Sequence, residues 1–144
     1  MTICARKSAF TLVEILIVVL LLGILAALVI PKYSSAAEEA RTNSLKMNLF
    51  QIRTQLEVYK QGHGNHPSLD NFADQMTKVS NPEGDTAEIG TPGFYLGPYL
   101  QSIPNNPNTG TNDISAGEVG SSAWYYDESV GHFQANDSEA NREF

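Results

Sequence analysis

Residues 10–30 decide how this chain is organised, and they read FTLVEILIVVLLLGILAALVI. Eighteen of these 21 residues are hydrophobic, and the exceptions are Thr11, Glu14 and Gly23. As an α-helix the stretch is about 31 Å long, close to the thickness of the hydrocarbon core of a bilayer. A buried helix of a soluble protein rarely runs this far without a polar face, so the stretch predicts a membrane span.

The charges beside this span predict its orientation. Arg6 and Lys7 lie just before it, whereas the flank just after it holds only Lys32. Because cytoplasmic flanks carry the excess of Lys and Arg, we expect a cytoplasmic N-terminus and residues 33–144 on the other side of the membrane.

Glu14 is the one charge inside the apolar run. A carboxylate in a membrane span is costly unless it is neutralised, paired or near the interface. One interpretation is an interfacial glutamate at a helix N-terminus, where the helix dipole favours an anion. The other is a charged partner, since cleavage between Ala9 and Phe10 would place a new α-amino group four residues before Glu14. Such a pair between neighbouring chains would set the register of their assembly, because an unpaired buried charge is strongly penalised.

Ala9 and the motif Phe10-Thr11-Leu12-Val13-Glu14 follow a short basic leader and precede the apolar run. This arrangement resembles the class III signal of type IV prepilins, a small residue (nearly always Gly) followed by Phe-Thr-Leu-x-Glu. Gly23 and Pro31 also fall where such proteins usually carry a glycine and a helix-bending proline. Ala9 departs from the pattern; alanine is the usual tolerated substitute in this family, so we expect processing to occur, at a slower rate.

The resemblance implies a set of roles for these residues. A prepilin peptidase would cleave after Ala9 and the new N-terminus, Phe10, would be N-methylated, with Thr11, Leu12 and Glu14 completing the processing motif. The family assembles into helical filaments in which Glu14 would lie near the Phe10 amine of an adjacent subunit. Phe10, Glu14, Gly23 and Pro31 are therefore the predicted assembly residues.

Two other interpretations of the N-terminus stay open. A secretory signal peptide could be cut after Ser35-Ala36-Ala37, where small residues occupy both recognition positions. The mature chain would then begin at Glu38 instead of Phe10, and an uncut chain would be a plain single-span anchor.

The helix is expected to continue past the membrane, with Pro31 bending it rather than ending it. An apolar stripe at helical spacing follows, made of Leu45, Leu49, Ile52, Leu56 and Tyr59. Ten of the eleven glycines and six of the seven prolines lie beyond residue 60, which predicts a turn-rich head with short strands. We expect a short helix around Phe72 capped by Ser68 or Asp70, a polar loop over 81–93, a hairpin of 124–126 with 132–135, and a frayed tail from 136 to 144.

These patterns predict an α+β protein, and the resemblance to type IV prepilins implies the type IV pilin-like fold. A long N-terminal helix, its first half embedded in the membrane, is expected to pack against a small C-terminal antiparallel β-sheet with long loops. The predicted segments are a leader (1–9), a transmembrane and filament-core helix (10–30), an amphipathic continuation (31–62) and a periplasmic head (63–144).

The C-terminal half adds a looser resemblance, to the major pseudopilins of type II secretion systems. Residues 97–110 (Gly-Pro-Tyr-Leu…Ile-Pro-Asn-Asn-Pro…Gly) and the aromatic run 124–126 are similar to the Tyr-Leu, Leu-Pro-x-Asp-Pro and aromatic-strand segments of that family. The single cysteine, Cys4, lies in the leader, so the mature chain has no disulfide. Many pilus-forming pilins carry one, and its absence favours a pseudopilin or a disulfide-free pilin.

Major pseudopilins commonly hold Ca²⁺ in their C-terminal loops, which makes calcium the one expected cofactor. Carboxylates suit this hard cation, and the candidates are Asp113, Glu118 and Asp127, with Glu128 beside them. Solvated acidic loops are the alternative, and Asn106 stands where the family motif has Asp. The histidines His63, His66 and His132 lack the further ligands that a zinc site needs.

No phosphate loop, nucleophile elbow or metalloprotease motif is present in the sequence, so no enzyme activity is expected. Nine Lys and Arg against sixteen Asp and Glu give no basic footprint for nucleic acid. The predicted function is a structural subunit of a type II secretion pseudopilus that drives protein export. It would form a homopolymer and meet prepilin peptidase, an inner-membrane assembly platform and other pseudopilins. The expected location is the inner membrane, followed by extraction into a periplasmic filament.

Two other functions remain as alternatives. A type IV or competence-type pilin would use the same N-terminal machinery. A membrane-anchored periplasmic binding module would use the helix only as a tether, and Glu14 would then have no role in assembly.

Overall fold

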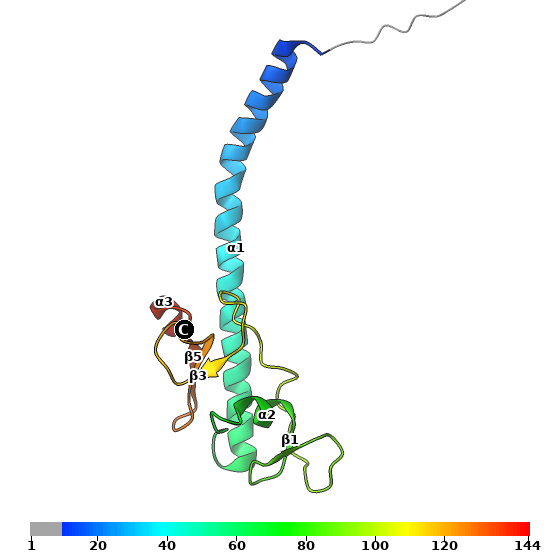
Figure 1. Cartoon of the computed structure of the whole chain (residues 1–144), viewed down its shortest axis with the longest axis vertical. Helices are drawn as coiled ribbons and strands as arrows, with labels where there is room; N and C mark the ends of the chain where they lie inside the picture. The colour runs from blue at the N-terminus through cyan, green and yellow to red at the C-terminus, as the bar shows by residue number, and fades with distance from the viewer. Residues whose placement is uncertain (1–9) are drawn as a thin grey trace, which may run out of the picture. The chain divides into compact units, whose positions relative to one another are not determined.

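The structure is a computed structural model that describes residues 10–144, apart from the side chains of Ile30, Pro31, Tyr33 and Ser34. The predicted leader, with Ala9 and Cys4, lies outside the described residues. The chain divides within its long helix, α1 (Leu12–His63), into two compact units, Met1–Ala40 and Arg41–Phe144 (Figure 1). The division falls inside the segment predicted as the amphipathic continuation of the helix.

Local signals fix both ends of α1. Thr11 precedes the helix, and its hydroxyl oxygen accepts a hydrogen bond from the backbone N–H of Glu14 at 3.2 Å. This is the usual arrangement of a threonine N-cap. The helix runs through Pro31, as predicted, and it ends at His63, where Gly64 takes a positive φ of 79° and closes the last turn.

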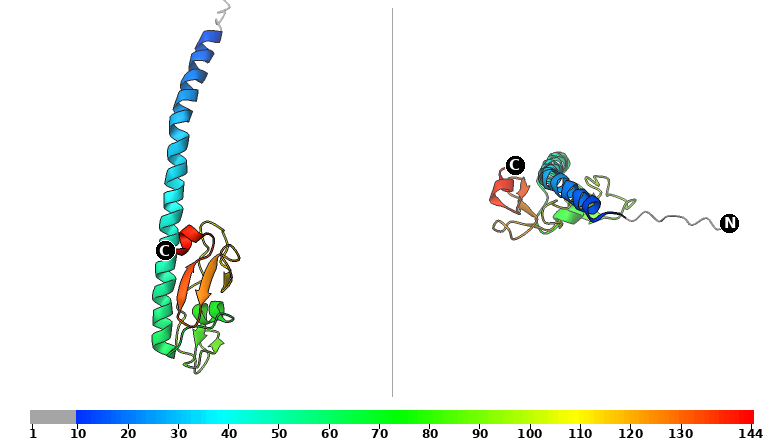
Figure 2. Two further views of the ribbon diagram at one scale, coloured as in Figure 1. Left: turned by 90° about the vertical axis from the view of Figure 1, so that its left-hand side faces the viewer. Right: turned by 90° about the horizontal axis from the view of Figure 1, so that it is seen from above.

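Five short strands and two short helices follow α1 in residues 64–144. Helix α2 (Phe72–Thr77) leads into a two-stranded antiparallel sheet of β1 (Val79–Ser80) and β2 (Thr86–Ala87). The second sheet contains β3 (Ile114–Ser115), β4 (Trp124–Asp127) and β5 (His132–Ala135). The short helix α3 (Glu139–Arg142) ends the fold. Within the second unit, β4 and β5 run alongside the last part of α1 (Figure 2).

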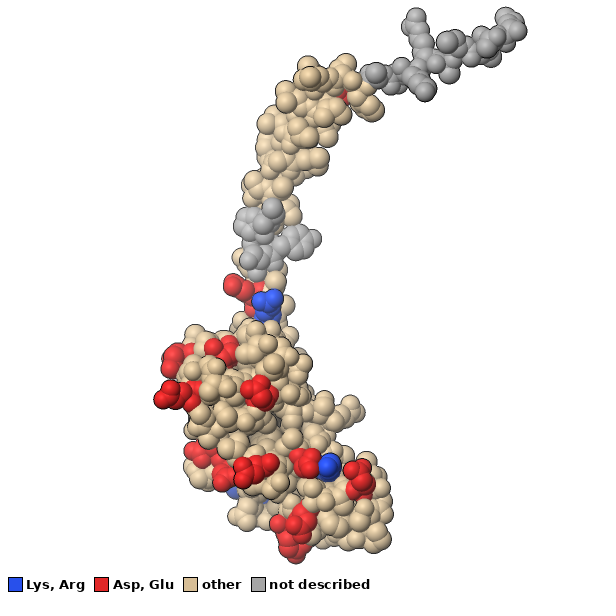
Figure 3. Space-filling view, viewed as in Figure 1, with Lys and Arg blue, Asp and Glu red and all other residues tan. Residues whose placement is uncertain are grey.

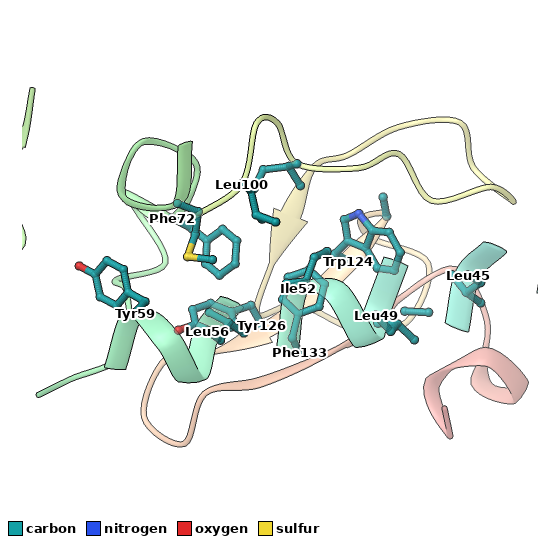
Figure 4. Packing of buried hydrophobic residues seen from close by; sticks show 14 residues of the cluster. Leu45, Leu49, Ile52, Leu56, Tyr59, Phe72, Leu100, Trp124, Tyr126 and Phe133 are labelled. Carbon is teal, nitrogen blue, oxygen red and sulfur yellow. The ribbon is translucent and has the colours of Figure 1, made fainter. Parts of the chain in front are cut away.

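The predicted stripe on α1 forms one wall of the head's core. Its five side chains, from Leu45 to Tyr59, are at most 2 % exposed. They contact Phe72 and Met76 of α2 and the inward-facing side chains of the hairpin, as Figure 4 shows. The inward-facing side chains are Trp124, Tyr126, Phe133 and Ala135, all at 0 % exposure. The hairpin register pairs Tyr126 with Phe133, so alternate residues of both strands reach the core.

The structure confirms the α+β fold and the predicted hairpin, and it differs from the sequence predictions in four details. The three-stranded sheet is mixed, because β3 pairs with β4 in parallel. The N-cap position of α2 belongs to Asn71, whose side chain makes no capping hydrogen bond, so the cap predicted from Ser68 or Asp70 is wrong. Ser68 is hydrogen-bonded to Gln75 instead: its backbone N–H donates to Gln75 Oε1 at 2.8 Å.

The other two differences concern segments that had been expected to lack regular structure. The polar loop over 81–93 contains strand β2, which pairs back onto β1. The tail is not frayed from residue 136, because Asn136 is fully buried and Ser138 caps α3 through the backbone N–H of Asn141 at 3.3 Å.

Candidate functional site

The predicted processing and assembly motif, Phe10 to Glu14, lies at the start of α1. Phe10 and Leu12 are 76 % and 82 % exposed, so nothing in the described chain covers them. Thr11 and Glu14 have the spacing of a capping box, with the threonine at the N-cap and the glutamate three residues later. The motif therefore starts the helix in addition to any role in processing, a role for Thr11 that the sequence analysis missed although the Thr-x-x-Glu pattern carries it.

Glu14 is exposed in this first turn, and within residues 10–144 the structure gives its carboxylate no ion-pair partner. Its position near the positive end of the helix dipole is favourable, and that effect is limited to about 0.3–1 kcal/mol at exposed sites. The carboxylate is thus available to a cation outside the described chain.

The apolar segment behind the motif has no internal packing partner. The 18 residues Leu12–Val29 meet the length and composition of a membrane span, and none of this window is buried in the structure. Its large hydrophobic side chains are 46–82 % exposed. A continuous apolar surface of this kind requires lipid or other helices around it. This supports membrane anchoring of the chain.

Gly23 lies in the middle of this segment, and no other part of the described chain contacts it. A Cβ built at Gly23 finds no atom within 4 Å. A glycine in a helix interior costs about 1 kcal/mol relative to alanine, and no contact within the described chain requires it here. Small residues in membrane helices let a second helix backbone come close. Gly23 would allow such an approach by a neighbouring helix.

Two histidines of the head, His63 and His66, pack against other residues of the head. The His63 ring stacks on Tyr59, and its two nitrogens lie 2.9 Å from the Tyr59 carbonyl and 3.0 Å from Ser80 Oγ. Ser80 is fully buried, so this Ser–His pair cannot meet a substrate. His66 packs its ring against Gly131, where a Cβ would clash with it.

The structure does not bring the three calcium candidates together. Asp113 lies at the start of β4, where its carbonyl accepts the N–H of Trp124 at 3.0 Å, and Asp127 ends the same strand. Four strand residues separate the two ends by about 10 Å, whereas Ca²⁺ binds its oxygen ligands at roughly 2.3–2.6 Å. Among residues 10–144 as described, no group of three or more His, Cys, Asp or Glu could hold a metal ion.

Each of these acids has other contacts. The hydroxyl of Thr111 holds the pKa of Asp113 below its usual value, and a hydrogen bond from Ser129 does the same for Asp127. The carbonyl of Glu118 accepts from Ser121 Oγ at 2.6 Å and from Asn136 Nδ2 at 3.0 Å. These three residues do not fit a single calcium site, and calcium binding stays a prediction.

Two buried asparagines hold the loop between β3 and β4, which contains Glu118. Asn136 Nδ2 donates to Glu118 O, Ser121 Oγ and Ser122 Oγ at 3.0, 3.3 and 2.9 Å. Asn106 Nδ2 donates to the Ala123 carbonyl at 2.9 Å and to Asp137 Oδ1 at 2.8 Å. Both asparagines are 0 % exposed. Sequence patterns gave no signal for this network, because its members come from three separate segments, at residues 106, 118–123 and 136–137.

Comparisons with known proteins match the N-terminal motif and the apolar helix described above. Residues 4–30 match the family described as the prokaryotic N-terminal methylation motif. The type II secretion system core protein G of Pseudomonas aeruginosa is 36 % identical over 108 residues, which cover 71 % of this chain and 68 % of the relative. Core protein G of Aeromonas hydrophila is 29 % identical over 102 residues, covering 71 % and 68 %.

A pilus protein also matches, over a shorter stretch. The fimbrial protein EcpB of Eikenella corrodens is 32 % identical over 75 residues, which cover 52 % of this chain and 46 % of that protein. No solved structure matches the chain. The relatives that match over most of the chain are structural pseudopilins, so the expectation that this protein is not an enzyme is confirmed. The chain belongs to the family of type II secretion system core protein G, the major pseudopilins.

Proposed function

We propose that this protein is a structural subunit of a type II secretion pseudopilus, which polymerises through the first part of α1. One observation carries the proposal: an apolar helix segment with no internal partner holds a single carboxylate, Glu14, that has no ion-pair partner among residues 10–144 as described. In lipid such a carboxylate needs a cation. A neighbouring subunit in a filament supplies one.

Processing prepares that cation. A prepilin peptidase cleaves between Ala9 and Phe10, and N-methylation leaves a positively charged amine on Phe10. Before assembly the N-terminus faces the cytoplasm and the head faces the periplasm, which follows from the basic residues before the span. The amine of one subunit then pairs with Glu14 of the next as the assembly platform draws subunits out of the inner membrane.

The pairing sets the register, and the apolar side chains supply the cohesion of the filament core. Gly23 allows neighbouring helices to approach closely, since no other part of the described chain lies near it. Pro31 has no backbone N–H to donate within α1, and the helix there is correspondingly easier to deform during packing. Addition of subunits at the membrane lengthens a short filament that pushes folded cargo outward.

Replacing the carboxylate tests the assembly role. We expect Glu14→Gln to lower the yield of sheared, cross-linkable filament at least about tenfold, because the Phe10 amine then enters the core unpaired. Glu38→Gln is the matched control, since it removes an exposed glutamate of the same helix outside the apolar run. Equal filament yields from both variants would contradict the assembly role of Glu14, and a wild-type chain that forms no filament would favour a tethered binding module.

N-terminal sequencing with mass spectrometry tests the processing step. The expected mature chain begins at Phe10 and carries one methyl group, and Ala9→Gly should process at least as fast. A mature chain beginning at Glu38 would indicate a secretory signal peptide, and an uncut chain a simple anchor. Either result contradicts the proposal.

A type IV pilin is the second candidate, and the match to the fimbrial protein EcpB favours it. That match covers less of both chains than the match to core protein G of P. aeruginosa. The neighbouring genes distinguish the two: secretion ATPase and secretin genes support the pseudopilus, and a retraction ATPase gene supports a pilus.

A further inference from the structure

In the structure the head is the second compact unit, Arg41–Phe144, which includes the last part of α1. Its charges are unevenly divided between α1 and the remaining elements. Over residues 41–63, α1 carries four Lys or Arg and one acid, Glu57. Residues 64–144 carry two Lys or Arg and twelve Asp or Glu. Acidic side chains predominate over the face of the head that Figure 3 shows. The head therefore has a basic helix and an acidic remainder.

A shallow groove opens on the basic helix. Lys46, Leu49, Phe50, Arg53 and Phe144 line it, and its volume is about 260 Å³. Phe50 is 74 % exposed in this groove, and Lys46 Nζ lies 4.2 Å from the centre of the Phe144 ring. Arg53 is held in place because its Nε donates to the Phe133 carbonyl at 2.8 Å. The groove thus presents the aromatic rings of Phe50 and Phe144 together with the cations of Lys46 and Arg53.

A loop of the same head has the complementary chemistry. Glu83, Asp85 and Glu88 are exposed on the segment that contains β2, and Ile89 beside them is 79 % exposed. The loop is internally braced. The backbone N–H of Asp85 donates to Asn81 Oδ1 at 2.8 Å, and the carbonyl of Glu88 accepts from the hydroxyl of Thr91 at 2.7 Å. An ordered loop loses little conformational entropy when it binds.

The groove and the loop lie at different places along α1. The groove residues on α1 lie between Lys46 and Arg53, whereas a Cβ at Gly84 in the loop would come within 3.2 Å of Tyr59 Oη. Figure 1 shows β1 and the loop after it at the C-terminal end of α1, away from α3. Two different complementary patches on one body form a heterologous contact, which propagates into an open filament instead of closing a dimer.

We propose that the groove of one subunit binds the acidic loop 83–89 of a second copy of this chain, with Ile89 against Phe50 and the loop carboxylates against Lys46 and Arg53. This contact rests on the proposed function, because it needs a filament in which heads are neighbours. It aligns the heads of neighbouring subunits by electrostatic contacts, in addition to the alignment of their helices by Glu14. Its strength falls as salt is added, since Lys46 and the loop carboxylates are exposed.

Disulfide cross-linking in the full chain tests the contact. In a Cys4→Ser background, Met47→Cys places a thiol beside Phe50 and Ile89→Cys places one on the loop. Met47 is 71 % exposed. Oxidation of filaments carrying both substitutions should give a ladder of multimers, because each subunit links to a different neighbour on each side. Each single substitution should give dimers at most. A double variant that stays monomeric or dimeric in intact filaments overturns the contact.

Charge reversal tests whether the two patches recognise each other. Lys46→Glu alone, or Glu83→Lys with Glu88→Lys, should lower the multimer yield about tenfold, which corresponds to 1.4 kcal/mol. Combining all three reversals should restore the yield to within about twofold. Lys60→Glu and Asp70→Lys are matched controls outside the patches and should change nothing. No rescue in the combined variant contradicts the pairing.

The Glu14→Gln variant separates this contact from the proposed function. If Glu14→Gln abolishes filaments while charge reversal of the head has no effect, the groove proposal fails and the pseudopilus proposal stands. If Glu14→Gln leaves filaments intact and the cysteine ladder still forms, the membrane register fails and the head contact stands. Melting curves of each variant confirm that the head remains folded.

Discussion

Leu21 and Leu49 are both leucines of α1, yet Leu21 is 55 % exposed and Leu49 is 1 % exposed. The difference lies in what each part of the helix has to pack against. The second part carries an apolar stripe and a polar face, and the head covers the stripe. The first part is apolar on all sides, and nothing within the described chain covers it. One helix therefore serves the fold with its second part and intermolecular contacts with its first.

This comparison explains why charges have different consequences in the two regions. Arg53 in the second part keeps its charge beside the core, bonded to the Phe133 carbonyl, although burial lowers the pKa of its guanidinium. Glu14 in the first part has neither burial nor a partner in the described chain. A polar group that the fold satisfies is structural, and one that the fold leaves unsatisfied is a candidate for assembly.

A matched pair of leucine truncations gives the largest expected effect. Leu49→Ala should lower the free energy of unfolding of the head by about 2–5 kcal/mol, because it leaves a cavity in a packed core. Leu21→Ala should leave that free energy unchanged. Urea unfolding of the full chain in detergent micelles measures both, followed by the fluorescence of Trp124, the one tryptophan. Equal effects would mean that the two parts of α1 do not differ in packing.

Alkaline pH should also destabilise the head selectively, since residues 15–29 contain no titrating side chain. Burial, and then the nearby Tyr99, raise the pKa of Tyr59 to about 12. A tyrosine whose pKa is higher in the folded state keeps its stabilisation below about pH 10 and loses it as the pH rises toward 12.

The expected loss from Tyr59 is on the order of 2 kcal/mol across that range. Urea midpoints measured from pH 8 to pH 12 give the slope, and Tyr59→Phe should flatten it in part. Burial also raises the pKa of Tyr126, whose hydroxyl donates to the Pro67 carbonyl, so some alkaline loss should remain. An unchanged slope in Tyr59→Phe would mean that its phenol is not the group that titrates.

Removing the Asn136 amide should have a smaller effect. Asn136→Ala leaves Glu118 O and two serine hydroxyls without their buried donor, at a cost of about 1–3 kcal/mol. Asn65→Ala is the control, because Asn65 is exposed. A calcium chelator tests the calcium prediction on the wild-type chain. A melting midpoint that falls with chelator supports calcium binding, and an unchanged midpoint contradicts it.

The sequence predicted the elements whose signals are local. The stripe from Leu45 to Tyr59 has the helical period, and the hairpin strands of 124–127 and 132–135 flank a turn that ends in Gly131. The N-terminal motif is a contiguous pattern, so its residues could be found without a structure. These features cover most of the fold and the assembly motif.

The features that the sequence did not predict depend on contacts between distant segments. The parallel pairing of β3 with β4 joins strands of two and four residues across a loop, and strands so short carry no period. The groove requires Phe144 to meet Lys46 of α1. Acidic residues are abundant in the last third of the chain, so composition alone could not show that Asp113 and Asp127 lie at opposite ends of β4.

The N-cap of α1 gives the smallest expected effect and applies to the membrane part alone. Thr11→Ala removes the acceptor for the backbone N–H of Glu14 and should destabilise the first turn by about 1 kcal/mol. Hydrogen exchange of the amides of residues 12–15 in micelles should speed up about fivefold, while exchange in the head stays unchanged. Thr11→Ser keeps the hydroxyl and should exchange like the wild type. If the filament yield of Thr11→Ala falls by more than the fivefold change in hydrogen exchange, the threonine also contacts a neighbouring subunit. Within the fold it serves only as a cap.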